Sequence, residues 1–141
     1  MKILVPVDGS AFSLKAVETA CDLAKAQPPS SLALMAVAIE IPELGEGRYI
    51  YEKMKAQAEV ALLKGKEVAQ GQGCGANLEV LLATGASPAD EIVRAAKAEK
   101  ADLIVIGSRG LAGKTSSFLG STASKVVTYS PCSVLVVKSQ D

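Results

Sequence analysis

The stretch Leu103-Ile104-Val105-Ile106-Gly107-Ser108-Arg109-Gly110 passes from four consecutive apolar residues into a loop of glycine, serine and arginine. A short apolar run rich in β-branched residues predicts a strand that is covered on both faces. Similar runs stand at residues 3–7, 32–39, 78–82 and 134–137. The chain is therefore expected to contain five buried strands.

Helical patterns separate these strands. Ala16, Ala20 and Ala24 recur every four residues in the first pattern, where small side chains would let a helix lie close to a sheet. Either Ser10 or Ser13 is expected to cap this helix at its start. Alternation of buried strands with helices predicts a parallel sheet with helices on both faces.

The other three helices are predicted from spacing and from helix-start residues. Apolar residues at helical spacing indicate a helix over residues 49–69. Ser87 and Pro88 are typical of the first positions of a third helix. A fourth helix is expected to follow the Gly/Ser-rich stretch 107–121 and to end near Tyr129, before Pro131. No linker divides the 141 residues, so a single domain, 1–141, is predicted.

Composition excludes several classes of function. The chain has no histidine, which excludes Ser-His-Asp triads and His-ligated zinc. Lys plus Arg and Asp plus Glu both number 15, and aromatic residues make up 4%, which argues against a broad nucleic-acid surface.

The apolar run at the N-terminus breaks at Asp8, too early for a signal peptide, and no segment is long enough to cross a bilayer. A cytoplasmic protein without membrane insertion is expected.

The three cysteines, Cys21, Cys74 and Cys132, do not share C-x-x-C spacing. An odd number without that spacing predicts neither a disulfide framework nor a zinc site. Cys21 lies on an apolar helical stripe and is expected to be buried. Cys74 and Cys132 fall in predicted connections, where a reactive thiol stays an open alternative.

A ligand in such a fold is expected beyond the carboxyl ends of the strands. Asp8 follows the first strand, and Gly107 to Gly110 follows the fourth. Gly120, Ser121 and Thr122 open a helix whose N-terminus would attract an anion. Arg109 and Lys114 add positive charge, and Asp8 could accept hydrogen bonds from a ribose. These features predict a nucleotide site; the alternative is that the glycines serve only a turn and the hydroxyls only a helix cap.

Two familiar phosphate motifs are absent. Gly113-Lys114-Thr115 is similar to the end of a P-loop, but Ser108 stands where that motif needs a glycine. The dinucleotide fingerprint G-x-G-x-x-G does not follow the first strand, so a dehydrogenase is not expected.

With these residues in place, the chain resembles the universal stress protein family. Its signature G-x2-G-x9-G-[ST] matches Gly107, Gly110, Gly120 and Ser121. Residues 6–10, 85–92, 101–107 and 131–138 are similar to other segments of the family, so the resemblance covers essentially the whole chain. It implies a Rossmann-like sheet of the adenine nucleotide alpha hydrolase type, with strand order 3-2-1-4-5. Strand one would then lie beside strand four.

The resemblance also implies a nucleotide-binding subgroup, with ATP, alone or together with Mg²⁺, as the ligand. The residues implied to line the adenine pocket are Pro6, Val7 and Val37; Asp8 would bind the ribose; and the phosphates would be held by Gly107, Arg109, Gly110, Gly120, Ser121 and Thr122. We expect a nucleotide-dependent sensor or switch in stress response, with no catalytic residue assigned. An interaction module that binds no nucleotide and a slow ATPase are the alternatives.

The last strand is expected at a sheet edge. Residues 134–137 are four apolar residues in succession, and no charge precedes Lys138. An uninterrupted apolar edge favours pairing with another chain. Because the family commonly pairs through this strand, a homodimer through Val134–Val137 is expected, with an edge covered by the chain's own helices as the alternative.

Overall fold

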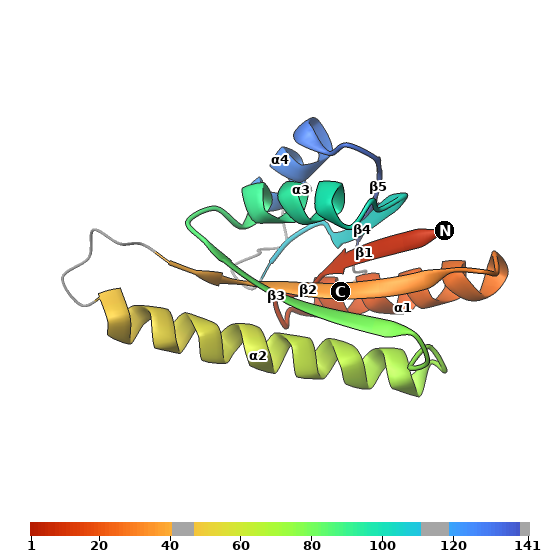
Figure 1. Cartoon of the computed structure of the whole chain (residues 1–141), viewed down its shortest axis with the longest axis horizontal. Helices are drawn as coiled ribbons and strands as arrows, with labels where there is room; N and C mark the ends of the chain where they lie inside the picture. The colour runs from red at the N-terminus through yellow and green to blue at the C-terminus, as the bar shows by residue number, and fades with distance from the viewer. Residues whose placement is uncertain (41–46, 111–118, 139–141) are drawn as a thin grey trace.

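The computed structural model describes residues 1–40, 47–110 and 119–138. Strands and helices alternate along this part of the chain, as the sequence predicts (Figure 1). The elements are β1 Lys2–Pro6, α1 Ala11–Ala26, β2 Ser31–Ile39, α2 Gly47–Gly71, β3 Leu78–Gly85, α3 Pro88–Ala98, β4 Leu103–Gly107, α4 Ser121–Tyr129 and β5 Ser133–Val137.

The five strands form one parallel sheet in the order β3-β2-β1-β4-β5, which confirms the predicted fold. The central strand β1 pairs with β2 on one side and with β4 on the other. Ile3 is in register with Leu103, and Leu4 with Ile104. The carboxyl ends of β1 and β4 therefore lie side by side, where the strand order changes direction.

Two helical layers cover the sheet. Helices α1 and α2 lie on one side and α3 and α4 on the other (Figure 1). Successive side chains of a strand point to opposite faces, so each strand contributes to both cores. Val5 packs beneath α1 with Val17, whereas Leu4 packs on the α3 side with Ile104. This double coverage explains why the strands are continuously apolar.

Three local features refine the expectations from sequence. Ser10 caps α1, with its Oγ accepting from the Ser13 backbone N–H, while Ser13 itself is buried within the first turn. Strand β3 extends to Gly85, beyond the predicted end at residue 82. Helix α3 is capped by Ser87 and begins at Pro88, as expected.

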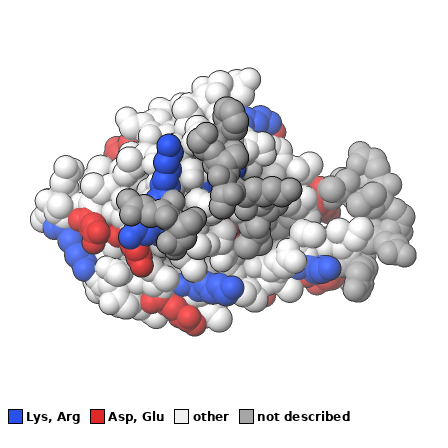
Figure 2. All heavy atoms as spheres, turned by 180° about the vertical axis from the view of Figure 1, so that it is seen from behind, with Lys and Arg blue, Asp and Glu red and all other residues white. Residues whose placement is uncertain are grey.

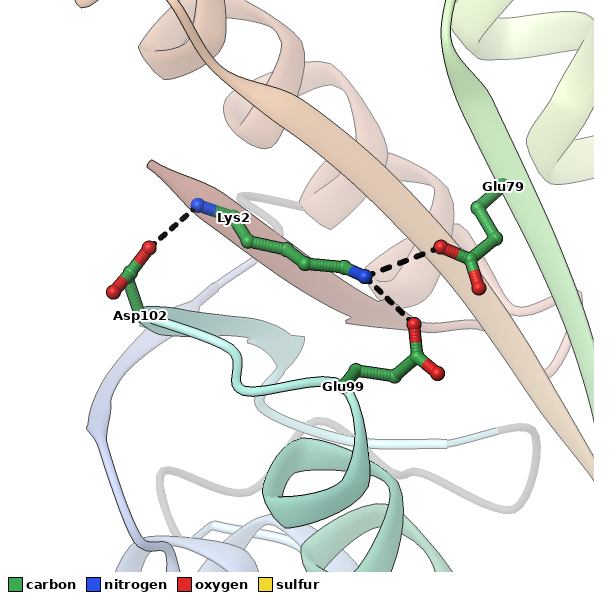
Figure 3. Close-up of polar contacts among 4 residues, drawn as sticks. All are labelled: Lys2, Glu79, Glu99 and Asp102. Carbon is green, nitrogen blue, oxygen red and sulfur yellow. Dashed lines mark hydrogen bonds and ion pairs between the residues drawn. The ribbon is translucent and has the colours of Figure 1, made fainter.

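A charged cluster joins three elements at the amino end of the sheet (Figure 3). The Lys2 ammonium lies 2.7 Å from a Glu99 carboxylate oxygen and 3.2 Å from one of Glu79. The Lys2 backbone N–H donates to the Asp102 carboxylate at 2.7 Å. The hydrogen bond from Lys2 lowers the pKa of the Glu99 carboxyl, and the same bond raises the pKa of Lys2. The cluster ties β1 to β3 and to the segment that leads from α3 into β4.

Charges of both signs are interspersed on the face shown in Figure 2, in keeping with a formal net charge of +0. Within the described ranges, no helix combines the length and apolar character that crossing a membrane requires.

Candidate functional site

A cavity of about 720 Å³ opens at the carboxyl ends of the strands. Pockets for small ligands commonly have volumes of about 300–1,000 Å³. All ten residues predicted for the site line this cavity: Pro6, Val7, Asp8, Val37, Gly107, Arg109, Gly110, Gly120, Ser121 and Thr122. Lys114, the other predicted contributor of charge, lies outside the described residues.

The two halves of the glycine motif meet through the backbone. The Gly120 N–H donates to the Ser108 carbonyl oxygen at 2.7 Å. A Cβ at Gly120 would lie 3.3 Å from that oxygen and 3.4 Å from the Arg109 Cα, so a side chain there would push the two segments apart. Ser108 is buried, and its N–H donates to the Val137 carbonyl at 2.8 Å. The turn after β4 and the start of α4 thus form one backbone unit on the cavity wall.

The N-terminus of α4 faces the cavity without a side-chain cap. Gly120 is the N-cap residue, and no side-chain hydrogen bond caps the first turn. The first intrahelical bond of this turn runs from the Ser124 N–H to the Gly120 carbonyl at 3.0 Å. The N–H groups of Ser121, Thr122 and Ala123 precede it, and these residues line the cavity. Unpaired N–H groups and the helix dipole favour an anion at this position.

Asp8 is oriented by the turn between β1 and α1. One carboxylate oxygen, Oδ1, accepts the Ser10 N–H at 2.9 Å, and the Asp8 N–H donates to Ser13 Oγ at 3.3 Å. Gly9 has a φ of +86°, a conformation that favours glycine in this turn. The other oxygen, Oδ2, would lie 2.6 Å from a Cβ at Gly110. An exposed carboxylate is thereby held beside the glycine turn of β4.

Gly107 has a reason for being glycine that differs from the expected one. The resemblance implies that Gly107 helps to hold the phosphates, where a missing side chain would let a phosphate approach the backbone. In the structure, a Cβ at Gly107 would instead lie 2.7 Å from the Phe12 carbonyl carbon and 2.8 Å from its oxygen. The first turn of α1 occupies that space. Gly107 therefore lets α1 pack against the end of β4, although the residue also lines the cavity.

Helices α2 and α3 supply cavity residues that the sequence reasoning missed. Met54, Gln57 and Ala61 reach the cavity from α2, and Pro88 and Ile92 reach it from α3. The spacing of the α2 residues is helical, which is also the signal for ordinary core packing. Gln57 is the exposed polar residue of this set. A polar side chain among these apolar residues is the signal that could have indicated a ligand.

The described residues contain no cluster of three or more His, Cys, Asp or Glu side chains that could hold a metal ion. Asp8 is the carboxylate among the described lining residues. The cavity thus combines an apolar wall at β1 and β2, one carboxylate, and a group of backbone donors beside Arg109. This arrangement suits a ligand that has a flat apolar part, hydroxyl groups and an anionic end.

Comparisons with known proteins agree with this fold. The sequence matches the Universal stress protein family over residues 1–138. It is 38% identical to the universal stress protein MJ0531 of Methanocaldococcus jannaschii over 141 residues, covering 97% of this chain and 81% of that one. The structure is similar to universal stress protein UspA from Lactobacillus plantarum, with a TM-score of 0.84, 29% identity and 97% of each chain covered. It is also similar to a universal stress protein in complex with cAMP, with a TM-score of 0.74, 29% identity, and 97% of this chain and 96% of that one covered. The chain belongs to the universal stress protein family.

Proposed function

We propose that the cavity binds ATP, and that the protein acts as a nucleotide-dependent sensor or switch in stress response. The observation that carries the proposal is the junction of the glycine turn with the uncapped N-terminus of α4, beside the Asp8 carboxylate. Backbone donors at a helix N-terminus bind phosphate, and a fixed carboxylate accepts hydrogen bonds from ribose hydroxyls.

The cavity suggests one orientation for the nucleotide. The adenine would lie against Pro6, Val7 and Val37, and Asp8 would accept from the ribose. The phosphates would be held by the unit that the Gly120–Ser108 hydrogen bond closes: Gly107, Arg109, Gly110, Gly120, Ser121 and Thr122. Mg²⁺ commonly keeps several waters and is bound through substrate phosphates, so it would arrive with ATP and needs no protein cage.

The similarity to a universal stress protein in complex with cAMP supports an adenine nucleotide as the ligand. ATP and cAMP share the adenine, the ribose and a phosphate. The cavity volume of about 720 Å³ leaves room for a larger phosphate chain than the cyclic monophosphate carries.

A slow ATPase and an interaction module that binds no nucleotide are the two alternative functions. A slow ATPase would need a group that orients and deprotonates water near the phosphates; the described lining offers only Asp8, which the proposal places on the ribose. An interaction module would leave the cavity empty.

We place the protein in the cytoplasm, as its reduced cysteines suggest.

We also propose a homodimer through β5. This strand is at the edge of the sheet, beside β4, and Leu135 on it has 38% of its surface exposed. Antiparallel pairing of two copies would satisfy the open backbone groups of both edges and bury apolar side chains around a two-fold axis.

Thermal unfolding with a panel of nucleotides tests the proposed ligand. At a concentration a hundred times the dissociation constant, a ligand adds about 2.7 kcal/mol of stability, which should raise the melting temperature by roughly 5–15 °C. Phosphate release, measured in parallel, separates the alternatives. Stabilisation without release supports the switch, stabilisation with steady release of phosphate supports the ATPase, and no stabilisation by any adenine nucleotide supports the interaction module.

A further inference from the structure

Two of the three cysteines lie together between α1 and the turn that follows α2. The Cys74 thiol is directed at the Cys21 carbonyl oxygen, with 3.7 Å between sulfur and oxygen. Both side chains belong to the same hydrophobic cluster, with Cys74 packed against it. Cys21 is fully buried in the core beneath α1, and Cys74 is half-buried at its edge. Residues far apart in the sequence thus form a pair in which one thiol is enclosed and the other reaches the surface.

The backbone holds Cys74 firmly in this position. Its N–H donates to the Ala69 carbonyl at 2.8 Å, which closes the end of α2. Gly73 has a φ of +81°, so the turn depends on a glycine there. The Lys25 ammonium crosses from α1 and donates to the Gln72 carbonyl. The turn is therefore fixed to α1 close to the thiol pair, with a cation beside it.

The two thiols differ in reactivity. Burial, and then the neighbouring Cys74 side chain, raises the pKa of the Cys21 thiol to about 12. Cys21 is consequently a protonated, solvent-inaccessible thiol at neutral pH. Oxidation of a cysteine follows its thiolate character and its exposure, so attack from solvent should begin at Cys74.

Cys132 provides an internal comparison. It is also half-buried and also lies in a connection, but its sulfur is 3.6 Å from the Ser130 hydroxyl. It packs with the core on the α3 side of the sheet, whereas Cys21 and Cys74 pack with the core on the α1 side. The sheet separates Cys132 from the pair in the folded protein.

We infer that Cys74 and Cys21 form an oxidisable dithiol, in which Cys74 reacts with a hydroperoxide and Cys21 resolves the product. The Cys74 thiolate attacks one oxygen of hydrogen peroxide, the O–O bond breaks, and hydroxide leaves; Cys74 becomes a sulfenic acid. The Cys21 sulfur then attacks the Cys74 sulfur. The S–O bond breaks, the Cys21 proton leaves with the hydroxyl as water, and a disulfide remains. Two thiols are oxidised and one peroxide is reduced to two waters.

The disulfide would link the middle of α1 to the end of α2. Such a link closes a long loop in the unfolded chain and should raise the melting temperature by roughly 5–15 °C. Helix α2 lines the cavity nearer its other end, so oxidation would also tie one wall of the cavity to α1.

The experiment treats the reduced, full-length protein with hydrogen peroxide at neutral pH and follows intact mass and peptide maps made without reductant. The wild type and Cys132→Ser should each lose two hydrogen atoms, yield a peptide pair joined through Cys21 and Cys74, and gain melting temperature that dithiothreitol reverses. Cys21→Ala should keep the sulfenic acid at Cys74, where dimedone traps it. Cys74→Ser should slow oxidation of Cys21 by at least tenfold.

The peptide map of the oxidised wild type tests the inference even if a variant folds poorly. If hydrogen peroxide oxidised Cys132 as fast as Cys74, the inference would be overturned. Equal rates would show that solvent exposure alone, and not the contact with Cys21, determines the reaction. Overoxidation of Cys74 without a link to Cys21, or a link that forms only in urea, would overturn it as well. Disulfides between two chains, formed in place of the Cys21–Cys74 disulfide, would also overturn the inference.

Discussion

The Asp8 carboxylate occupies the space that a side chain at Gly110 would need, since a Cβ there would lie 2.6 Å from Asp8 Oδ2. Asp8 follows β1 and Gly110 follows β4, so this contact depends on the adjacency of the two strands. It sets a carboxylate and a glycine turn on one wall of the cavity.

Gly110→Val should weaken ATP binding by at least tenfold, which is about 1.4 kcal/mol. The branched side chain would displace the Asp8 carboxylate and fill the proposed phosphate position. Isothermal titration measures the effect. The matched control is Gly71→Val, because a Cβ at Gly71 meets no atom within 4 Å. Equal affinity of a folded Gly110→Val protein and the wild type would show that the phosphates lie elsewhere.

Gly107→Ala should lower the free energy of unfolding by about 1–3 kcal/mol, as is typical of overpacking. The added methyl group would press on the Phe12 carbonyl at 2.7 Å, and that atom belongs to the backbone of α1. Urea denaturation measures the change, with Gly71→Ala as the control that should be neutral or stabilising. An unchanged midpoint for Gly107→Ala would mean that α1 does not need this close approach.

Glu99→Gln should make the free energy of unfolding depend less on pH between pH 7 and pH 3. Because the Lys2 ammonium lowers the pKa of Glu99 in the folded protein, this group stabilises the fold above its unfolded pKa. The contribution is lost as pH falls through the lowered folded value. The raised pKa of Lys2 acts in the opposite sense, since its contribution is present at low pH and lost as pH rises through the folded value.

Urea midpoints of the wild type and Glu99→Gln between pH 7 and pH 3 test this assignment. We expect a difference of about 1 kcal/mol or less at pH 7 that shrinks toward pH 3. Glu18→Gln is the control, because the Lys15–Glu18 pair is more exposed, with 56% and 39% of the side chains accessible. A difference between wild type and Glu99→Gln that stays constant with pH would contradict the role given to the Lys2 pair.

Leu135→Lys should convert the proposed dimer to a monomer at micromolar concentration. A lysine on an edge strand opposes pairing with another strand, and Leu135 is partly exposed on β5. Sedimentation velocity measures the state. Leu63→Lys is the matched control, because Leu63 is a 56% exposed leucine on α2. A monomeric wild type, or a Leu135→Lys variant that stays fully dimeric, would exclude β5 as the interface.

The sequence patterns were enough to predict the five strands and their alternation with helices, and the family resemblance implied the strand order. Ten of the residues that line the cavity were also expected there. The strands were evident because burial on both faces leaves continuous apolar runs, and Asp8 and Gly107 were placed correctly because parallel strands align their carboxyl ends. Ser10 and Ser13 could not be separated as caps, since both are good N-cap residues three positions apart.

Contacts between distant segments were beyond the reach of sequence patterns. The close approach of the Phe12 carbonyl to Gly107 cannot be predicted from the sequence, because it is made by backbone atoms that any residue at position 12 would carry. The α2 residues of the cavity were missed because Met54 and Ala61 have the same helical spacing whether they face a core or a ligand. The Cys21–Cys74 contact likewise depends on the path of the chain and not on a motif.

The central claim is that phosphate binds at the N-terminus of α4, and amide chemical shifts measured by NMR test it most directly. Titration with ATP and Mg²⁺ should move the amide signals of residues 107–110 and 120–123, whereas adenosine should move the signals near Val37 and leave those of residues 120–123 in place. The account predicts that difference between the two ligands. ATP that binds without moving the signals of residues 120–123, or that moves none at millimolar concentration, would contradict it.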